Sequence, residues 1–237
     1  MRLEDFSNGF DTLLNSYSRR GDFGTTDADI RLDEYEKSLF LTKAQEELAL
    51  SLYNGKNPYN ESFEQTEELR RYLAPLVEEV TLNPIETTNG QPLGVESSSK
   101  FFTLPEKLWF ITYEAVKVSQ GKCEENATMD VYPVRQDEYH KIKRNPFRGA
   151  NDRRALRLDL SEGNVEIVCK YNVVQYYIRY LRRLKPIILA DFGEENPIEG
   201  YTEAQECELP DSLHQRILET AVQMAIQSRG YSINRDK

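Results

Sequence analysis

The sequence is poor in the residues that usually build metal or redox centres. Its 237 residues include two histidines and three cysteines. Cys123, Cys169 and Cys207 are odd in number, lie far apart and form no Cys-x-x-Cys pair, which favours buried, reduced thiols over disulfides or zinc. His140 and His214 have no second ligand at metal spacing, so we expect surface or interface histidines and no metal site.

Motifs of enzymes and membrane proteins are also missing. The chain has no Gly-x-Ser-x-Gly, no Gly-x-x-x-x-Gly-Lys-Ser/Thr and no Gly-x-Gly-x-x-Gly. We therefore expect no enzyme and no cofactor. Hydrophobic runs are too short for a membrane span, and Met1 to Tyr17 is acidic and periodic, unlike an export signal. No membrane partner is predicted.

Positive charge is in deficit. The chain carries 40 acidic and 30 basic side chains, a formal charge of −10, which argues against a protein that wraps nucleic acid by neutralising phosphates. An acidic wall that lets DNA slide past without sticking is compatible with this balance. The hydrophobic content of 39% is sufficient for a sizeable core.

The N-terminal third is predicted to be helical. Apolar residues recur at intervals of three and four from Leu3 to Tyr17, which places them on one stripe of a helix. Asp33 can cap a second helix that runs to about Tyr53. This helix is apolar on more than one face, so it should pack on more than one side, within the monomer or against a neighbouring subunit. A third helix is predicted within 63–73, before Pro75.

From about Thr81 the apolar pattern has a period of two. Leu108 to Val118 is apolar at both parities, as expected for a central strand that is covered on both faces, and a returning strand follows around 129–131. A short helix is predicted at 136–143. The segments 156–160 and 165–171 alternate around a turn at 161–164 and predict a hairpin.

The segment 176–184 fits a helix or a strand. Tyr177, Ile178 and Leu181 have helical spacing, whereas Tyr176, Ile178 and Tyr180 fit one face of a strand. We favour a strand because aromatic and β-branched residues dominate and Pro186 follows closely.

The predicted fold class is α+β, with N- and C-terminal helices forming a bundle and an inserted, mainly antiparallel β domain. The regions are 1–80 (helical), 81–190 (β-rich), 191–208 (an acidic loop) and 209–230 (a C-terminal helix packing back on the N-terminal helices). The candidate core residues of the bundle are Leu3, Phe6, Phe10, Leu13, Leu213, Ile217, Ala221 and Met224.

Two basic clusters, within 141–157 and 179–185, stand out against the acidic background. Three interpretations of the second cluster are open: pairing with carboxylates of a neighbouring copy, a solvated face, or a nucleic-acid platform that uses the interleaved tyrosines. The acidic composition favours pairing between copies.

Several segments resemble a known family in their order along the chain. They are Asp33 to Glu47, Pro133-Val134-x-x-Asp137-Glu138-Tyr139, Asn145-Pro146-Phe147, Tyr180 to Ile187, and Leu209-Pro210-x-x-Leu213-His214-x-x-Ile217-Leu218. Together they resemble the head-to-tail connector proteins (ring or adaptor proteins) of tailed bacteriophages, most closely those of the crAss-like group. In the segment Tyr180 to Ile187 this chain departs from the pattern of the family, because Leu184 stands where a proline is expected.

The resemblance implies a structural protein that forms a ring with itself, typically of about twelve copies. Such a ring lies in the virion at the portal–tail junction, beside the portal and other tail or ring proteins, and is assembled in the cytoplasm of the bacterial host. Genome DNA passes through its lumen without specific binding. The candidate subunit interface comprises Asn145, Phe147, Tyr176, Arg179, Tyr180, Arg182, Arg183 and Lys185. The alternative is a small binding or regulatory module that uses the basic-aromatic strand 176–185.

Overall fold

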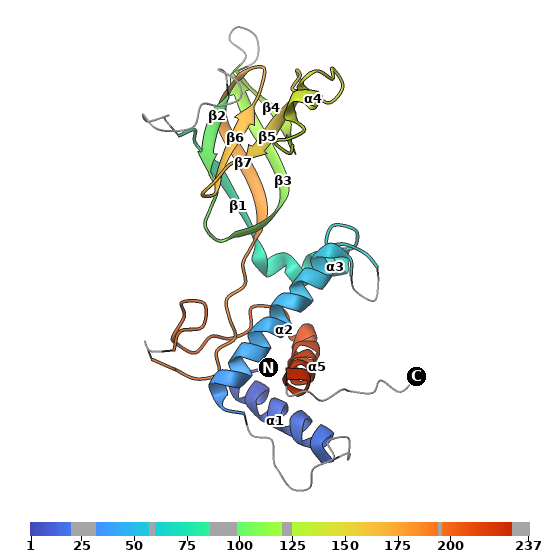
Figure 1. Cartoon of the computed structure of the whole chain (residues 1–237), viewed down its shortest axis with the longest axis vertical. Coiled ribbons are helices and arrows are strands. Elements are labelled where there is room, and N and C mark those ends of the chain that lie inside the picture. Colours follow the sequence, from blue (N-terminus) through green and yellow to red (C-terminus); the bar gives the residue numbers. More distant parts are fainter. Residues whose placement is uncertain (20–31, 57–59, 86–98, 120–124, 194–195, 229–237) are drawn as a thin grey trace. The chain divides into compact units, whose positions relative to one another are not determined.

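The computed structural model describes residues 1–19, 32–56, 60–85, 99–119, 125–193 and 196–228. The chain forms two compact units (Figure 1). The helical unit comprises Met1–Pro75 and Leu184–Lys237, and the sheet unit comprises Leu76–Arg183. The predicted α+β class with a mostly antiparallel sheet is confirmed.

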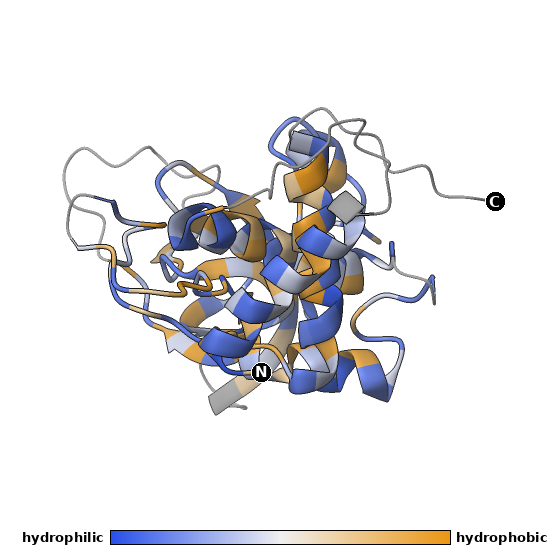
Figure 2. Cartoon of the chain, turned by 90° about the horizontal axis from the view of Figure 1, so that it is seen from below, coloured by the Kyte–Doolittle hydropathy of each residue, from blue (hydrophilic) through white to orange (hydrophobic). Residues whose placement is uncertain are grey.

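The helical unit contains α1 (Leu3–Arg19), α2 (Glu34–Asn54), α3 (Glu67–Leu73) and α5 (Asp211–Ser228). Hydrophilic and hydrophobic residues alternate around its helices, as Figure 2 shows. Phe6, Phe10 and Leu14 form the buried stripe of α1. A Cβ atom on Gly9 would lie 2.8 Å from Leu218 Cδ2 of α5, so this glycine permits the close approach of α1 and α5.

Helix α2 begins as the sequence predicted. Asp33 Oδ1 accepts a hydrogen bond from the Glu36 backbone N–H at 2.7 Å, and Glu36 Oε2 accepts one from the Asp33 backbone N–H at 3.2 Å, which is a capping box. Lys37, although it carries a charge, has a side chain only 4% exposed.

Lys37 joins α2 to α1 through its ammonium group. Nζ lies 2.8 Å from Asp11 Oδ2 and 3.1 Å from Glu34 Oε1, and it donates to Ser7 Oγ at 3.2 Å. Burial alone would lower the pKa of Lys37, but the hydrogen bonds to Asp11 and Glu34 outweigh it and the pKa is raised. The buried cation is therefore fully paired.

The two-sided packing of α2 is satisfied within the chain. One side meets α1 and α5, and another holds the segment 184–189. Thr42 Oγ1 accepts a hydrogen bond from Ile187 N at 3.1 Å, and Gln45 Nε2 donates to Lys185 O at 2.8 Å. These bonds satisfy backbone groups of an irregular segment that would otherwise be buried without partners.

The sheet unit contains seven strands and one short helix. The strands are β1 (Val77–Leu82), β2 (Lys100–Thr103), β3 (Leu108–Ser119), β4 (Glu125–Pro133), β5 (Arg154–Asp159), β6 (Asn164–Val168) and β7 (Asn172–Arg182), and the helix is α4 (Tyr139–Lys143). Their order in the sheet is β1-β7-β3-β4-β5-β6-β2. All neighbours are antiparallel except β4 and β5, which are parallel.

The sheet curls until its ends meet. Phe102 of β2 packs against Tyr176 of β7 with ring centroids 5.3 Å apart, although these strands lie near opposite ends of the strand order. The enclosed face holds the main core, which includes Val116, Val131 and Ile167. A second, smaller cluster lies on the outer face of β5 and β6, where Tyr139 of α4 packs on the apolar side chains Leu156, Leu158 and Val168.

The predicted strand at 176–184 is confirmed as β7, and the hairpin turn at 161–164 connects β5 to β6. The short helix is shorter than predicted, because the chain at Gln136 forms a turn in which its Nε2 donates to Asp159 O. The expectation that both faces of β3 are covered is wrong: Tyr113 and Lys117 are exposed on its outer face.

Two predictions about single residues can be compared with the structure. Cys169 is buried and reduced as expected, Cys207 is half-buried, and Cys123 lies outside the described residues. His214 is not a surface residue: it is buried, its Nε2 lies 2.8 Å from Leu209 O, and its ring packs against Phe6 at 5.2 Å.

The borders of the two units differ slightly from the predicted boundaries at 80 and 190. Strand β1 begins at Val77, directly after the short 3-10 turn that follows α3. Residues 184–189 pack on α2 through Thr42 and Gln45 and belong to the helical unit.

Candidate subunit interface

The basic-aromatic strand β7 has one inward and one outward face. Tyr176 is completely buried and Tyr180 is 4% exposed, both in the enclosed core of the sheet unit. This corrects the expectation that they face a neighbouring copy. The alternation of a strand sends these two tyrosines inward while Tyr177 and Arg179 point outward.

The arginines of β7 have carboxylate partners on β1 of the same chain. Glu79 lies directly opposite Arg179 in the sheet, and its Oε1 is 4.0 Å from Arg179 Nε. Glu78 Oε1 is 3.2 Å from Arg182 Nε, and Glu78 Oε2 accepts a hydrogen bond from the Tyr180 hydroxyl at 2.8 Å. These arginines therefore have carboxylate partners within the chain, and their pairing with a neighbouring copy stays a prediction.

Burial of Tyr180 and its hydrogen bond to Glu78 raise the pKa of the phenol to about 12. The hydroxyl therefore stays protonated at neutral pH and donates a hydrogen bond to Glu78. Tyr176 and Tyr180 are buried, and Arg179 and Arg182 lie beside Glu79 and Glu78, so Tyr177 is the one tyrosine of the segment 176–185 that could stack on a base, which weakens the alternative of a binding module.

Two further basic residues of the candidate interface, Arg183 and Lys185, follow the end of β7. Arg183 is exposed, and its backbone N–H donates to Lys107 O at 2.8 Å. In the helical unit, Lys185 Nζ lies 3.8 Å from Glu208 Oε1, a residue of the predicted acidic loop, in a half-exposed pair of modest strength.

A buried ionic cluster lies inside the curled sheet and was missed by the sequence analysis. Arg157 of β5 donates from Nη1 to both oxygens of Glu114 of β3 at 3.0 Å, and Tyr176 donates to Glu114 Oε2 at 2.6 Å. Burial raises the pKa of the Glu114 carboxyl, although Arg157 and Tyr176 oppose the shift. One signal was available in the sequence: Arg157 lies two residues after Ala155, so both side chains point to the same face of the strand, and alanine is a small residue suited to a core.

The remaining candidates, Asn145 and Phe147, lie in the loop that follows α4. Asn145 Oδ1 accepts a hydrogen bond from the Phe147 N–H at 2.9 Å, and Arg154 Nη1 donates to Phe147 O at 2.9 Å. Arg154 also lies over the Tyr132 ring, 4.3 Å from its centroid. The Phe147 side chain is 85% exposed. These hydrogen bonds fix the backbone of the loop while the large apolar side chain of Phe147 stays exposed to solvent, where a partner can reach it.

The candidate core residues of the helical unit divide into two groups. Five are buried: Phe6, Phe10, Leu213, Ile217 and Ala221. Leu3, Leu13 and Met224 are only half-buried, at the margins of the stripes. Leu14 is buried in place of its neighbour Leu13, and Leu218 is buried in addition to its neighbour Ile217.

Within the described ranges, no three His, Cys, Asp or Glu side chains gather closely enough to hold a metal ion. In the same part of the chain, no helix combines the length and the apolar character needed to span a bilayer.

Comparison with known proteins identifies relatives along the whole chain. A family model described as "Phage tail ring protein 3/4" matches residues 1–237. Ring protein 3 of Bacteroides phage crAss001 is 46% identical over 232 residues, which cover 97% of this chain and 96% of that protein. Ring protein 4/5 of the same phage is 28% identical over 236 residues, covering 95% of this chain and 92% of that protein.

Proposed function

This chain belongs to the phage tail ring protein 3/4 family, and we propose that copies of it assemble into a closed ring at the junction between portal and tail. Membership in this family implies a structural role in the virion and not an enzymatic one. The expected partners are further copies of the chain, the portal and the neighbouring ring and tail proteins. A ring of about twelve copies is the expected assembly.

One observation carries this proposal: the similarity to ring proteins extends over both structural units, without a large insertion or a missing region. The exposed Phe147 on a hydrogen-bonded loop supports the proposal, because an assembly protein must keep contact residues exposed until the partner arrives.

The proposed role of the ring as a channel for DNA is compatible with the charge of the chain. A chain of charge −10, repeated around a ring, makes a lumen that repels the phosphate backbone unless all acidic residues face outward. DNA then passes without the several phosphate contacts per copy that strong, salt-dependent binding requires. Tight binding of duplex DNA by the purified chain at low salt would contradict this part of the proposal.

The proposal is tested by the mass and location of the protein. The purified chain has a mass of 27.6 kDa, so mass photometry should detect a species of about 330 kDa for twelve copies. Mass spectrometry of purified virions should find the protein at far lower copy number than the major capsid protein. A purified chain that remains monomeric, together with its absence from virions, would refute the proposed function.

A further inference from the structure

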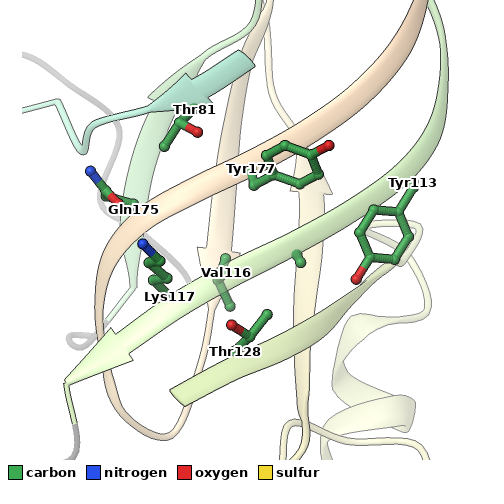
Figure 3. Close-up of a pocket in the computed structure, with 8 residues that line it drawn as sticks. Thr81, Tyr113, Val116, Lys117, Thr128, Gln175 and Tyr177 are labelled. Atoms are coloured by element: carbon green, nitrogen blue, oxygen red, sulfur yellow. The ribbon is translucent and has the colours of Figure 1, made fainter. Parts of the chain in front are cut away.

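The outer face of the sheet unit contains a hollow above Ala115. Every second side chain of β3 points outward, so Ala115 lies between Tyr113 and Lys117 along the strand. On the neighbouring strands, its register partners are Tyr177 of β7 and Asp130 of β4. Ala115 has the smallest side chain of this group, so it forms the floor between larger neighbours. Figure 3 shows the rings of Tyr113 and Tyr177 on one side of the hollow and Lys117 on the other.

The hollow has the size of a small-molecule site and an aromatic wall. Its volume is about 350 Å³, and sites for small molecules range from about 300 to 1,000 Å³. The rings of Tyr113 and Tyr177 meet edge to face, with centroids 6.1 Å apart, and Tyr113 is 45% exposed. Tyr177 alone is no stacking platform, but these two tyrosines from adjacent strands together offer an aromatic surface to a planar ligand.

The rim of the hollow offers hydrogen bonds of both kinds. Thr81 of β1, Thr128 of β4 and Gln175 of β7 line it. A hydroxyl group both donates and accepts, and a side-chain amide carries a donor and an acceptor. A purely apolar occupant, such as a phenyl ring, would cover these groups without pairing them, which costs free energy. The rim therefore favours a planar ligand whose edge carries donors and acceptors.

The charges around the hollow favour a ligand with a negative group. Glu79 and Arg179 pair with each other at 4.0 Å, and Asp130 is the register neighbour of Arg154. The two acidic residues beside the hollow thus each have a basic residue next to them. Lys117 is exposed, and within the described ranges no carboxylate pairs with it. Its ammonium group remains for an anionic group of the ligand.

Wall, rim and cation together select one class of ligand. A nucleotide has a planar base that stacks on tyrosine, base edges that donate and accept hydrogen bonds, and a phosphate that binds lysine. A carboxylate-rich peptide would pair with Lys117 but would leave the aromatic wall unused. An aromatic side chain of another protein would use the wall but would leave the rim and Lys117 without partners.

We propose that the hollow above Ala115 binds the base of a nucleotide, with its phosphate at Lys117. The base belongs to a free nucleotide or to an unpaired stretch of a nucleic-acid strand, since both present the same chemistry. A base of duplex DNA is excluded, because it must first leave its stack and its pair. This inference goes beyond the proposed ring and is compatible with duplex DNA that passes without strong binding.

Photo-crosslinking of the full chain tests where the base lies. The probe is a short single strand of bromodeoxyuridine, which on irradiation joins a neighbouring aromatic side chain with loss of hydrogen bromide. Mass spectrometry should find the strand on Tyr113 or Tyr177. Tyr132 is also 45% exposed but does not line the hollow, so it serves as an internal control. Crosslinks on Tyr132 or elsewhere, with none on Tyr113 or Tyr177, would overturn the inference.

Competition measured by fluorescence anisotropy identifies the ligand. A dye-labelled single strand is bound first, and unlabelled thymidine monophosphate, single strand, duplex or polyglutamate is then added. The monophosphate and the single strand should compete, and the duplex and polyglutamate should not. A strand that competes far better than the monophosphate identifies a nucleic-acid strand as the source of the base, and equal competition identifies a free nucleotide. Competition by polyglutamate as strong as that by the strand would overturn the inference in favour of an acidic peptide.

Variants of the wall and of the cation separate their roles. Tyr177→Thr removes a ring but keeps a residue suited to a strand, and it should weaken binding of the single strand at least about five-fold, whereas Tyr132→Thr should not. Lys117→Gln should reduce the slope of log affinity against log salt by about 0.7, the value for one phosphate contact, and Lys117→Arg should restore it. Lys107→Gln, at another exposed position of the sheet unit, is the matched control.

The same samples distinguish this inference from the proposed function. Affinity and salt dependence unchanged in both Tyr177→Thr and Lys117→Gln would overturn the nucleotide site. Mass photometry of each sample reports ring formation independently. Rings that bind no single strand would refute the nucleotide site and leave the proposed ring in place. A wild-type chain that binds the strand but forms no ring would instead refute the proposed function.

Discussion

The helical unit and the sheet unit differ in how completely they cover their own apolar surface. In the helical unit, α1, α2, α5 and the segment 184–189 cover one another. Among the described residues, the most exposed large apolar side chains are Tyr113, Tyr132, Phe147 and Val174 in the sheet unit and Met1 in the helical unit. The helical unit is thus stabilised mainly by contacts within the chain, whereas the sheet unit keeps apolar surface available for partners.

The largest effect is expected in the helical unit. Ile217 is completely buried in α5, and Ile217→Asp would place a charge in this core. Replacing a buried isoleucine by alanine already costs roughly 2–5 kcal/mol, and an unpaired buried charge adds to that, so we expect a loss of about 5 kcal/mol or more. Such a loss approaches the whole stability of a typical domain. Thermal unfolding should show an unfolded or insoluble chain.

The exposed Ser212, in the first turn of the same helix, provides a control for this change. Ser212→Asp should melt within a few degrees of the wild type, because an acidic residue near a helix N-terminus is favourable. Equal melting temperatures for Ile217→Asp and Ser212→Asp would show that the helical unit does not depend on this core.

The sheet unit should be most sensitive at its buried ionic cluster. Arg157→Met leaves Glu114 buried without its cation, and breaking a buried pair from one side costs about 3–5 kcal/mol. Adding Glu114→Gln should recover part of this loss, since the residual buried charge is removed. A double-mutant cycle by denaturant unfolding measures the coupling. Additive effects of the two changes would mean that the pair does not stabilise the sheet unit.

A smaller effect is expected where β1 pairs with β7. Glu78→Gln weakens the contacts of Tyr180 and Arg182, and because Glu78 is about half exposed the cost should be about 1 kcal/mol. Glu106→Gln, at an exposed position of the same unit, should be neutral. Unfolding of the monomeric chain by urea measures both variants. If the arginines of β7 paired chiefly with a neighbouring copy, Glu78→Gln would leave the stability of the monomer unchanged.

The smallest expected effect is a pH dependence from Glu114. Its folded-state pKa is raised above the ordinary value of 4.5, chiefly by burial. Its contribution to stability is therefore fully present below pH 4.5 and is lost as the pH rises through the folded pKa. The melting temperature of the wild type minus that of Glu114→Gln should increase from about pH 7 to about pH 4. A difference that increases with pH would contradict the assigned direction.

The sequence predicted the elements that have a strong local pattern. The capping box at Asp33, the period of α1, the hairpin turn at 161–164 and the strand character of β7 all depend on residues close together in the chain. The α+β class followed from the order of these elements.

What the sequence did not predict depends on pairing between distant strands. The curl that buries Tyr176 against Phe102, and the contact of Arg157 with Glu114, join residues 43 to 74 positions apart. A tyrosine and an arginine in a strand look like surface residues until the opposite wall of the sheet is known. The acidic partners of β7 were also hidden, because β1 has little apolar alternation, with burial only partial at Val77, Val80 and Leu82.

A cryo-electron microscopy structure of the assembled ring would test most directly that the sheet unit carries the contact between copies. We predict that neighbouring copies meet through their sheet units and that this contact covers Phe147, whose side chain is 85% exposed in the single chain. A ring held together by the helical units alone, with Phe147 open to solvent, would contradict this account.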